Sequence, residues 1–574
     1  MDFKQIKANL KKDFEGFKKI KVAILADSST QYLAQAIKGI GYEKKVNINI
    51  WEAEYNAIDL TISDSDSELY SFKPDFTIIF LSSQKLKKKF YKSGSDPGFA
   101  ESMMTYLNNV ASTISSHVKT NFLVVNFPDT LDSVFGNYSG KVTSSFSYQQ
   151  KKINIELMHW AQSAAAVSLI DLCGLHAAYG ASNTIDNRLY ISSDAIFSLD
   201  FTVEFASNCV QVIEAFTGGS RKCLILDLDN TLWGGIIGDD GLENIQIGDL
   251  GIGKAFTEIQ LWAKALKDRG IILAVCSKND EANAKEPFEK HPDMVLRKED
   301  IAVFVANWSN KHDNIKYIQS VLNIGFDSMV FIDDNPFERN MVRTYLPEVN
   351  VPELPEDPAE YLAYLNKLNL FETNAYTEED KARTQLYKAE ALRNDASRIY
   401  TSEADFLKSL DMISEAKPFD SFSIPRVAQL TQRSNQFNLR TQRYTEEDVK
   451  RMAENQDKYH TFSFTLADKY GSHGLIGVII LEKKDNKTLF ADTWIMSCRV
   501  LKRGMEQFML NEIMKYAKHH KFERITGEYI ETKKNGMVRD HYKNLGFTAE
   551  GDSWYRNTKD YKPETCYIKN SDKL

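Results

Sequence analysis

The stretch at residues 223–235, CLILDLDNTLWGG, decides how the rest of the chain is interpreted. Its first four residues form an apolar run without alternation, which is typical of a buried strand in a parallel sheet. Asp227 and Asp229 follow directly, at the carboxyl end where open α/β sheets place their ligands. Two carboxylates so close together repel each other unless a cation lies between them. The stretch therefore indicates a site for a hard cation such as Mg²⁺.

Two later stretches repeat the pattern of an apolar strand followed by polar residues. Residues 271–280 are IILAVCSKND, and residues 329–339 are MVFIDDNPFER. Helical segments such as FTEIQLWAKALKDRG, residues 256–270, lie between the strands and would form the crossovers of a parallel sheet. Because the carboxyl ends of parallel strands meet at one edge, we expect one catalytic assembly from about residue 218 to about residue 345.

Length and composition predict a multidomain α/β protein. A chain of 574 residues predicts three or four domains, and 43% hydrophobic and 26% charged residues are ordinary for globular ones. Four prolines between residues 347 and 358 indicate a domain boundary. The strand-like segments near the C-terminus follow one another with short turns, which favours an antiparallel meander. We expect an α/β domain at 1–200, a catalytic domain at 201–358, a helical connector at 359–410 and a mixed α/β domain at 411–574.

Charge and cysteine usage narrow the possible partners and compartment. The net charge of -8 argues against a nucleic acid or an anionic membrane surface as the main partner. Six cysteines are scattered without CxxC spacing, which is typical of a reducing compartment. The sequence has no secretion signal and no membrane-spanning run of apolar residues. We therefore predict a cytoplasmic protein.

The charged residues of the assembly have the properties that nucleophilic displacement at phosphorus requires. Asp227 can attack phosphorus and form an aspartyl-phosphate. Asp229 can protonate the leaving oxygen and later deprotonate water. Lys311 can neutralise the phosphoryl group, although Lys298 and Lys316 are close enough in sequence to compete for this role.

The remaining polar residues have predicted binding roles. Ser277 and Asn279 are assigned to the substrate, and Ser277 can donate a hydrogen bond to a phosphoryl oxygen. Thr231 is placed with them and can fix the loop by bonding a backbone group or Asp229. The oxygen shell of a Mg²⁺ would come from Asp227, from Asp229 through its backbone carbonyl, and from Asp333 and Asp334.

These motifs resemble a known superfamily. DLDNT, the CSK segment, the lysine and FIDD resemble the four ordered motifs of haloacid dehalogenase (HAD) phosphatases, which implies a Rossmann-like parallel sheet for the central domain. DLDNTLWGGIIGDDGLENIQIG, NWSNKHDNI and the segment around FIDDNPFERNMVR look like the FkbH-like family, over about residues 185–415. That resemblance implies an enzyme that dephosphorylates a glyceryl donor and loads the glyceryl unit on the thiol of an acyl carrier protein. Cys276 is the positional candidate for a thioester relay, against the alternative that a cysteine inside an apolar strand only packs.

The C-terminal segments resemble GNAT acyltransferases. SCRVLKRGMEQ, residues 497–507, resembles their loop for the pyrophosphate of acetyl-CoA and supplies Arg499, Arg503 and Gly504. Met505 follows Gly504 where the family's phosphate-binding loop has a different residue. Two alternatives therefore stay open: the domain binds acetyl-CoA as an acyltransferase, or it binds only the phosphopantetheine arm of a carrier protein. KKNGMVRDHYKNLGF supplies Asn535 and Tyr542, a tyrosine that the resemblance makes the acid for a departing thiolate.

The N-terminal domain has a flavodoxin-like or SGNH-like pattern of strands and helices. ADSS, residues 26–29, resembles the first block of SGNH hydrolases and would make Ser28 a nucleophile. Asp171 and His176 are the nearest activating pair, but they are five residues apart instead of in that family's DxxH. The alternative is that Ser28 caps a helix and the domain only binds or orients a partner.

Two other functions stay open beside glyceryl transfer. One is a small-molecule phosphatase fused to an N- or O-acetyltransferase that acts in sugar or polysaccharide biosynthesis. The other is a scaffold that binds a carrier protein without catalysis. The intact DLDNT motif weighs against the scaffold.

Overall fold

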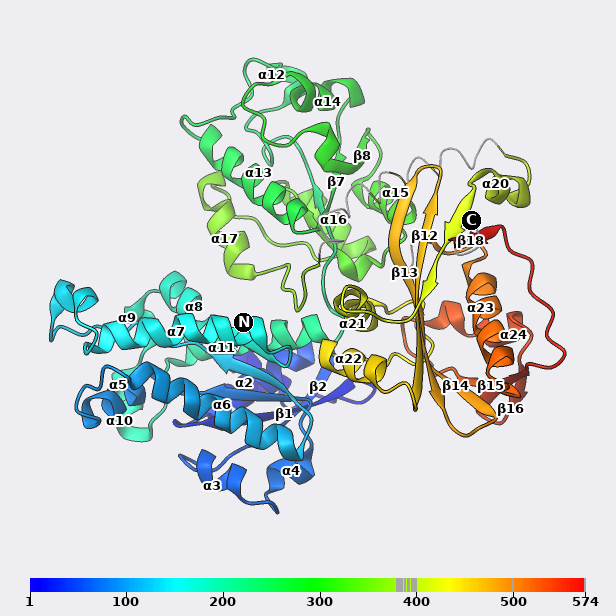
Figure 1. The fold of residues 1–574 in the computed structure, drawn as a ribbon. Coiled ribbons are helices and arrows are strands. Elements are labelled where there is room, and N and C mark those ends of the chain that lie inside the picture. Colours follow the sequence, from blue (N-terminus) through cyan, green and yellow to red (C-terminus); the bar gives the residue numbers. More distant parts are fainter. Residues whose placement is uncertain (378–385, 387–388, 390–392, 394–399, 498–499, 572–574) are drawn as a thin grey trace. The chain divides into compact units, whose positions relative to one another are not determined.

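The computed structural model describes residues 1–377, 386, 389, 393, 400–497 and 500–571. The chain divides into two compact units, residues 1–214 and 215–574 (Figure 1). The boundary lies inside helix α11 (Leu199–Phe216), which begins where the first predicted domain ends. None of the described helices is long and apolar enough to cross a membrane.

The first unit is built on a parallel sheet of order β2-β1-β3-β4-β5. Its strands are β1 (Lys18–Ala26), β2 (Val46–Glu52), β3 (Phe76–Phe80), β4 (Asn121–Val125) and β5 (Val167–Ile170). Its other helices are α1 (Phe3–Asn9), α2 (Gln31–Glu43), α3 (Ile58–Ser63), α4 (Glu68–Phe72), α5 (Ser83–Lys92), α6 (Phe99–His117), η1 (Gly136–Lys141), α7 (Phe146–Ser163), α8 (Leu172–Tyr179), α9 (Ala181–Thr184) and α10 (Asn187–Ser193). Strand β3 is buried along its whole length, which explains why its sequence does not alternate.

The predicted serine site of this unit does not form. Ser28 lies after β1 with a buried hydroxyl that has no hydrogen-bond partner among the described residues. It does not cap α2, whose N-cap residue is Thr30, so the capping alternative is wrong. The Asp171 carboxylate caps α8 and accepts a hydrogen bond from Asn126 (2.8 Å), and no hydrogen bond between it and His176 is found among the described residues.

The second unit begins with a parallel sheet of order β8-β7-β6-β9. Its strands are β6 (Cys223–Leu226), β7 (Ile272–Ser277), β8 (Ile301–Ala306) and β9 (Met329–Ile332). Its helices are α12 (Ile237–Asp240), α13 (Gly253–Asp268), α14 (Glu281–Lys290), η2 (Lys298–Asp300), α15 (Lys311–Leu322), η3 (Phe326–Ser328), α16 (Pro336–Tyr345), η4 (Pro358–Glu360) and α17 (Tyr361–Leu368). Alternate residues of β6 pack on opposite faces of the sheet: Leu224 and Leu226 face α13, and Cys223 and Ile225 face α15.

The C-terminal part of this unit is a larger mixed sheet of order β16-β17-β15-β14-β13-β12-β10-β18, with β11 paired to β12. Its strands are β10 (Met412–Ser414), β11 (Ala416–Lys417), β12 (Tyr459–Asp468), β13 (Gly471–Lys483), β14 (Thr488–Met496), β15 (Arg524–Glu528), β16 (Thr548–Glu550), β17 (Ser553–Asn557) and β18 (Ile568–Asn570). The helices are α20 (Glu403–Ser409), α21 (Ser423–Arg433), α22 (Glu446–Glu454), α23 (Met505–His519), η6 (Gly536–Val538) and α24 (His541–Asn544).

The predicted meander is confirmed, since β12, β13 and β14 pair antiparallel in sequence order. Helices α23 and α24 pack on one face of this sheet, and α21 and α22 pack on the other (Figure 1). The predicted connector at 359–410 contains α17 and α20, and most of residues 378–399 lies outside the described residues.

A buried histidine makes the stability of this sheet depend on pH. Burial lowers the pKa of His541 to about 3, so its imidazole is neutral in the folded protein. The unfolded chain takes up a proton there below the ordinary histidine pKa of about 6.5, which favours unfolding as the pH falls. His541 packs edge-on against Phe437 and Trp494, so phenylalanine should fit its place.

We predict that His541→Phe reduces the stability lost between pH 7 and pH 5 by about 2 kcal/mol, because the variant has no imidazole to protonate on unfolding. The measurement is thermal unfolding of both proteins at the two pH values. His519→Phe, at an exposed position of α23, is the matched control. An equal pH response in His541→Phe and the wild type would contradict the prediction.

Candidate active site

Strand β6 delivers the two aspartates of the DLDNT motif to the centre of one sheet edge. The strand lies between β7 and β9, and it ends at Leu226. Asp227 follows and continues the pairing, because its backbone amide donates to the carbonyl of Ile332 (3.0 Å). The Asp227 side chain is buried. This placement agrees with the expectation that the site lies at the carboxyl ends of the strands.

Lys311 is the lysine of this site. It lies at the start of α15, and its Nζ is 2.9 Å from Asp227 Oδ2 and 2.6 Å from Asp333 Oδ2. The competing candidates Lys298 and Lys316 are paired with carboxylates elsewhere. Burial alone would lower the pKa of the Lys311 ammonium, but the two adjacent carboxylates outweigh it and raise the pKa above its ordinary value. Lys311 is therefore a fixed positive charge.

Three carboxylates form a cluster that fits a divalent cation. Oxygen atoms of Asp227, Asp333 and Asp334 lie within 4.8 Å of one another, and only Lys311 is paired with them among the described residues. When all three are ionised, two negative charges remain uncompensated. Burial and the repulsion of Asp227 raise the pKa of Asp333 to about 7 and that of Asp334 to about 6.

One buried atom of the cluster has no partner among the described residues. Asp227 Oδ1 is buried and has no hydrogen-bond partner among the described residues. A carboxylate oxygen left in this state destabilises a protein unless a ligand satisfies it. Carboxylate oxygens are the ligands that Mg²⁺ prefers, so these residues fit that ion.

The Asp229 carboxylate lies outside the cluster and is held by three donors. Its Oδ1 accepts hydrogen bonds from Trp233 Nε1 (2.9 Å) and the backbone amide of Ile237 (3.0 Å). Its Oδ2 accepts one from Asn279 Nδ2 (2.9 Å). Burial raises the pKa of Asp229, which favours a carboxyl group that can carry a proton. Since both lone pairs of Oδ1 are used, Oδ2 is the oxygen with room for that proton.

Asn279 therefore orients Asp229 in this structure, although we predicted a substrate contact for it. Trp233 was not predicted at all. Its sequence signal is an aromatic residue four positions after Asp229 in DLDNTLW, but a tryptophan there could equally be a core residue. It is in fact fully buried, and packs edge-on against Phe288 while its indole N–H reaches the carboxylate.

The other predicted binding residues lie at the same edge. Thr231 Oγ1 accepts a hydrogen bond from the backbone amide of Asp334 (3.2 Å), which ties the loop after β6 to the loop after β9. Ser277 is buried at the end of β7. Arg339, which we did not predict, donates to the backbone carbonyls of Asp333 (2.8 Å) and Asp334 (2.6 Å) and so fixes that loop.

Cys276 has no access for a relay role. Its side chain is fully buried in the core on the α15 face of the sheet, and its thiol donates a weak hydrogen bond to the Lys311 carbonyl (3.6 Å). Burial raises the pKa of the thiol well above its ordinary value, so the nucleophilic thiolate is suppressed. The structure therefore supports the packing alternative.

The predicted cofactor residues of the C-terminal sheet are engaged internally. Arg503 is buried, and its guanidinium lies 3.3 Å from Asp468 and 3.2 Å from His473. Gly504 is the N-cap of α23 with a φ of +78°, but a Cβ there would lie 3.7 Å from Cys566, so the C-terminal segment lies close by. Arg499 lies outside the described residues.

Asn535 and Tyr542 are also buried. The Asn535 amide donates to the carbonyls of Asn438 (3.0 Å) and Ile530 (2.9 Å), which makes it a clamp between two loops. Tyr542 packs among aromatic rings, with its hydroxyl against Gly527, and burial raises the pKa of the phenol. The described geometry thus gives neither residue the solvent access that its predicted role requires.

Comparison with known proteins identifies relatives of the parts of the chain that contain the two parallel sheets. A family model described as the FkbH N-terminal domain matches residues 21–214. The N-terminal part of a Bacteroides fragilis protein, described as containing a phosphatase domain and solved with Mg, is 50% identical. The match covers 65% of this chain and all of that chain, with a TM-score of 0.63. The curated proteins contain no match.

Weaker similarities involve acetyltransferases. A Vibrio cholerae spermidine N-acetyltransferase in complex with CoA and spermine is 12% identical, over 26% of this chain and 97% of that chain. A putative GNAT acetyltransferase from Desulfovibrio desulfuricans is 13% identical, over 26% of this chain and 99% of that chain. Both have a TM-score of 0.21, which is too low to support an argument about this protein.

The Bacteroides fragilis relative shows the family of this chain, because the match is 50% identical and covers the whole of that relative. That relative contains a phosphatase domain, and the family model matches the N-terminal part of this chain. The chain therefore belongs to the FkbH-like family of HAD-type phosphatases.

Proposed function

We propose that this protein is a Mg²⁺-dependent enzyme that dephosphorylates a phosphorylated glyceryl-type donor and loads the glyceryl unit on the thiol of an acyl carrier protein. The observation that carries the phosphatase part is the cluster of Asp227, Asp333 and Asp334 around Lys311 at one sheet edge. The glyceryl donor and the carrier come from the family to which the chain belongs. The Mg²⁺ is supported by the oxygen-only donor set and by the ion in the Bacteroides fragilis relative.

In this proposal the phosphoryl transfer has two steps, the formation of an aspartyl-phosphate and its hydrolysis. A carboxylate oxygen of Asp227 attacks phosphorus, and the bond from phosphorus to the substrate oxygen breaks. Asp229 gives its proton to that departing oxygen and then takes a proton from the water that hydrolyses the aspartyl-phosphate. Lys311 stays positively charged beside the reacting carboxylate and offsets phosphoryl charge. A bound Mg²⁺ would neutralise further charge on the phosphoryl oxygens.

The acyl step is proposed without a cysteine relay, since Cys276 is buried. In that step the pantetheine thiol of the carrier would attack the carbonyl of a glyceryl donor activated as an acyl phosphate. The carbon–sulfur bond forms, the bond from the carbonyl carbon to the phosphate oxygen breaks, and inorganic phosphate leaves with the thiol proton, while the Asp227 reaction would hydrolyse a phosphate ester of the same donor. The rival function is a phosphatase joined to an acetyltransferase that uses acetyl-CoA. The buried positions of Tyr542 and Arg503 weigh against transfer through those residues.

The reaction product distinguishes the two functions. We expect the wild type, incubated with a phosphorylated glyceryl donor and a phosphopantetheinylated carrier, to add a glyceryl mass to the carrier in intact-mass spectrometry. Phosphate release is measured in the same samples. An unmodified carrier, together with acetyl transfer from acetyl-CoA to a sugar acceptor, would overturn the proposal in favour of the acetyltransferase.

We predict that Asp227→Asn abolishes phosphate release, by about a thousandfold or more, because the amide keeps the shape of the side chain but is no nucleophile. The measurement is release of inorganic phosphate with Mg²⁺ present. Asp239→Asn makes the same chemical change at an exposed position of α12 and should leave the rate unchanged. Near-normal activity in Asp227→Asn would refute the assignment of the nucleophile.

We predict that Asn279→Ala selectively weakens proton donation to poor leaving groups, because Asp229 Oδ2 loses the donor that orients it. The turnover of an alkyl phosphate should fall about tenfold or more, whereas that of p-nitrophenyl phosphate should change much less, since its leaving group needs no proton. The measurement is kcat for both substrates at saturating Mg²⁺.

Asn283→Ala, at an exposed position of α14, is the matched control for Asn279→Ala. The Mg²⁺ concentration for half-maximal activity should stay the same in both variants, because the Asn279 amide donates to Asp229 and makes no hydrogen bond with the carboxylate cluster among the described residues. An equal fall with both substrates would mean that Asn279 contacts the substrate, as its sequence position first suggested.

A further inference from the structure

The loop between β4 and α7 presents an apolar surface in a part of the chain that the phosphatase site does not use. Four of its large side chains are exposed, namely Leu131, Val134, Phe135 and Tyr138. Leu131 is 96% exposed, and Tyr138 is 62% exposed. Single exposed apolar residues are ordinary on a protein surface, but four between residues 131 and 138 form a patch. Patches of this kind mark sites of interaction with a partner.

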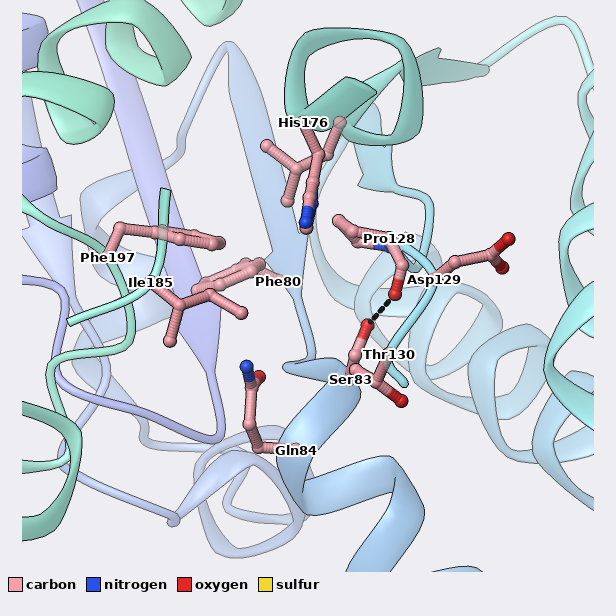
Figure 2. Close-up of a pocket in the computed structure, with 10 residues that line it drawn as sticks. Phe80, Ser83, Gln84, Pro128, Asp129, Thr130, His176, Ile185 and Phe197 are labelled. Carbon is pink, nitrogen blue, oxygen red and sulfur yellow. Dashed lines mark hydrogen bonds between the residues drawn. The ribbon is translucent and has the colours of Figure 1, made fainter. Parts of the chain in front are cut away.

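The loop is held against α5, so the exposed side chains are presented on a fixed backbone. Figure 2 shows where the contact begins: the Ser83 hydroxyl, at the start of α5, donates to the Pro128 carbonyl (2.8 Å). One turn further along the helix, Lys87 Nζ donates to the Leu131 carbonyl (3.1 Å). A surface that is already ordered loses little conformational freedom when a partner binds to it.

Lysines lie at the border of the apolar side chains. Lys88 and Lys92 are exposed on α5, and each comes one position after a residue that binds the loop. Lys141 ends η1, and its ammonium lies over the Tyr138 ring, 5.5 Å from the ring centroid. These three lysines and the four exposed side chains together form the lysine-rimmed patch.

The lysine-rimmed patch carries uncompensated positive charge. The two aspartates of the loop are already paired, Asp129 with Lys151 and Asp132 with Lys87. No ion pair of the three rim lysines is found in the described part of the chain. This local charge is opposite in sign to the net charge of the whole chain, which is -8. The patch is therefore suited to an acidic partner.

We propose that the lysine-rimmed patch is the docking surface for the carrier protein that receives the glyceryl unit. The choice of partner rests on the proposed function. Phosphopantetheine carriers are small helical proteins with acidic surfaces, so their charge is complementary to that of the rim. The apolar side chains would form the centre of the interface and the lysines its border, which is the usual arrangement between proteins.

An anionic membrane is the other kind of surface that combines negative charge with an apolar interior. Segments that bind such membranes by charge usually carry a cluster of about four to eight basic residues. The patch has three uncompensated lysines, and the net charge of the chain opposes adsorption to an anionic surface. A carrier protein is thus the partner that the charges favour.

The first test reverses the charge of the rim in the full-length protein. Glyceryl loading is measured at increasing concentrations of the phosphopantetheinylated carrier, and phosphate release from the small donor is measured without carrier. We expect Lys88→Glu/Lys92→Glu to raise the carrier concentration for half-maximal loading at least about tenfold at low salt, because attraction is replaced by repulsion. Phosphate release should stay unchanged. Lys4→Glu/Lys38→Glu makes the same change at exposed positions of α1 and α2, and should load like the wild type.

The second test removes an apolar contact. Leu131→Ser should raise the carrier concentration for half-maximal loading about fivefold at both low and high salt, because apolar contacts are not screened by ions. Leu60→Ser, at an exposed position of α3, is the matched control and should have no effect. All four variants should keep the melting temperature of the wild type, since the replaced side chains are exposed.

The outcomes separate the docking surface from the proposed function. Equal carrier dependence in the two charge-reversal variants would overturn docking at this patch and leave the proposed function intact. A wild type that releases phosphate but loads no carrier would refute the transfer reaction and the choice of partner together. Co-sedimentation with vesicles of one-third phosphatidylserine, lost only in Lys88→Glu/Lys92→Glu and without a change in loading, would assign the patch to a membrane and overturn the proposal.

Discussion

The repulsion among the carboxylates at the ends of β6 and β9 is the constraint on which the active site depends. Asp227, Asp333 and Asp334 are held within 4.8 Å of one another by two adjacent strands, and Lys311 compensates only part of their charge. Burial and mutual repulsion raise the pKa values of Asp333 and Asp334. The sheet tolerates this arrangement because its strands are apolar and packed on both faces, which fixes the loops that carry the charges. A site of this kind is poised for a divalent cation and a phosphoryl group.

The two aspartates in DLDNT have different hydrogen-bond and ion-pair partners. Asp227 faces Lys311 and has an unpaired oxygen, whereas Asp229 is turned toward Trp233 and Asn279. Residues only two positions apart therefore have different partners and different chemistry. The separation suits the proposed roles, in which Asp227 is the nucleophile and Asp229 handles protons.

Buried polar groups behave differently in other parts of the chain. In the C-terminal sheet Arg503 and Asn535 are used internally, in an ion pair and a loop clamp. In the N-terminal unit the buried Nε2 of His176 has no hydrogen-bond partner among the described residues. Burial alone thus does not mark a functional residue. What matters is whether the polar atoms already have partners within the protein.

The sequence by itself determined the central sheet and the main carboxylates of its site. Apolar runs that end in DLD and IDD require buried strands with acidic tips, because a parallel strand covered on both faces is apolar throughout and its carboxyl end is where polar residues can emerge. It also determined the meander of β12, β13 and β14, which follows from the short turns between consecutive strand-like segments. These are local patterns, and a single chain segment carries each of them.

Only the tertiary structure decided the partners of these side chains. Lys311 could be distinguished from Lys298 and Lys316 only when α15 brought its first residue to Asp227. The fold placed Asn279 2.9 Å from Asp229 and buried both Cys276 and Tyr542, and the local sequence shows none of these placements. Periodicity gives the face of a strand or helix, but the distance to a residue 50 or 100 positions away depends on how the elements pack. Hydrogen-bond partners, burial and pKa shifts all depend on that packing, and so they are decided in three dimensions.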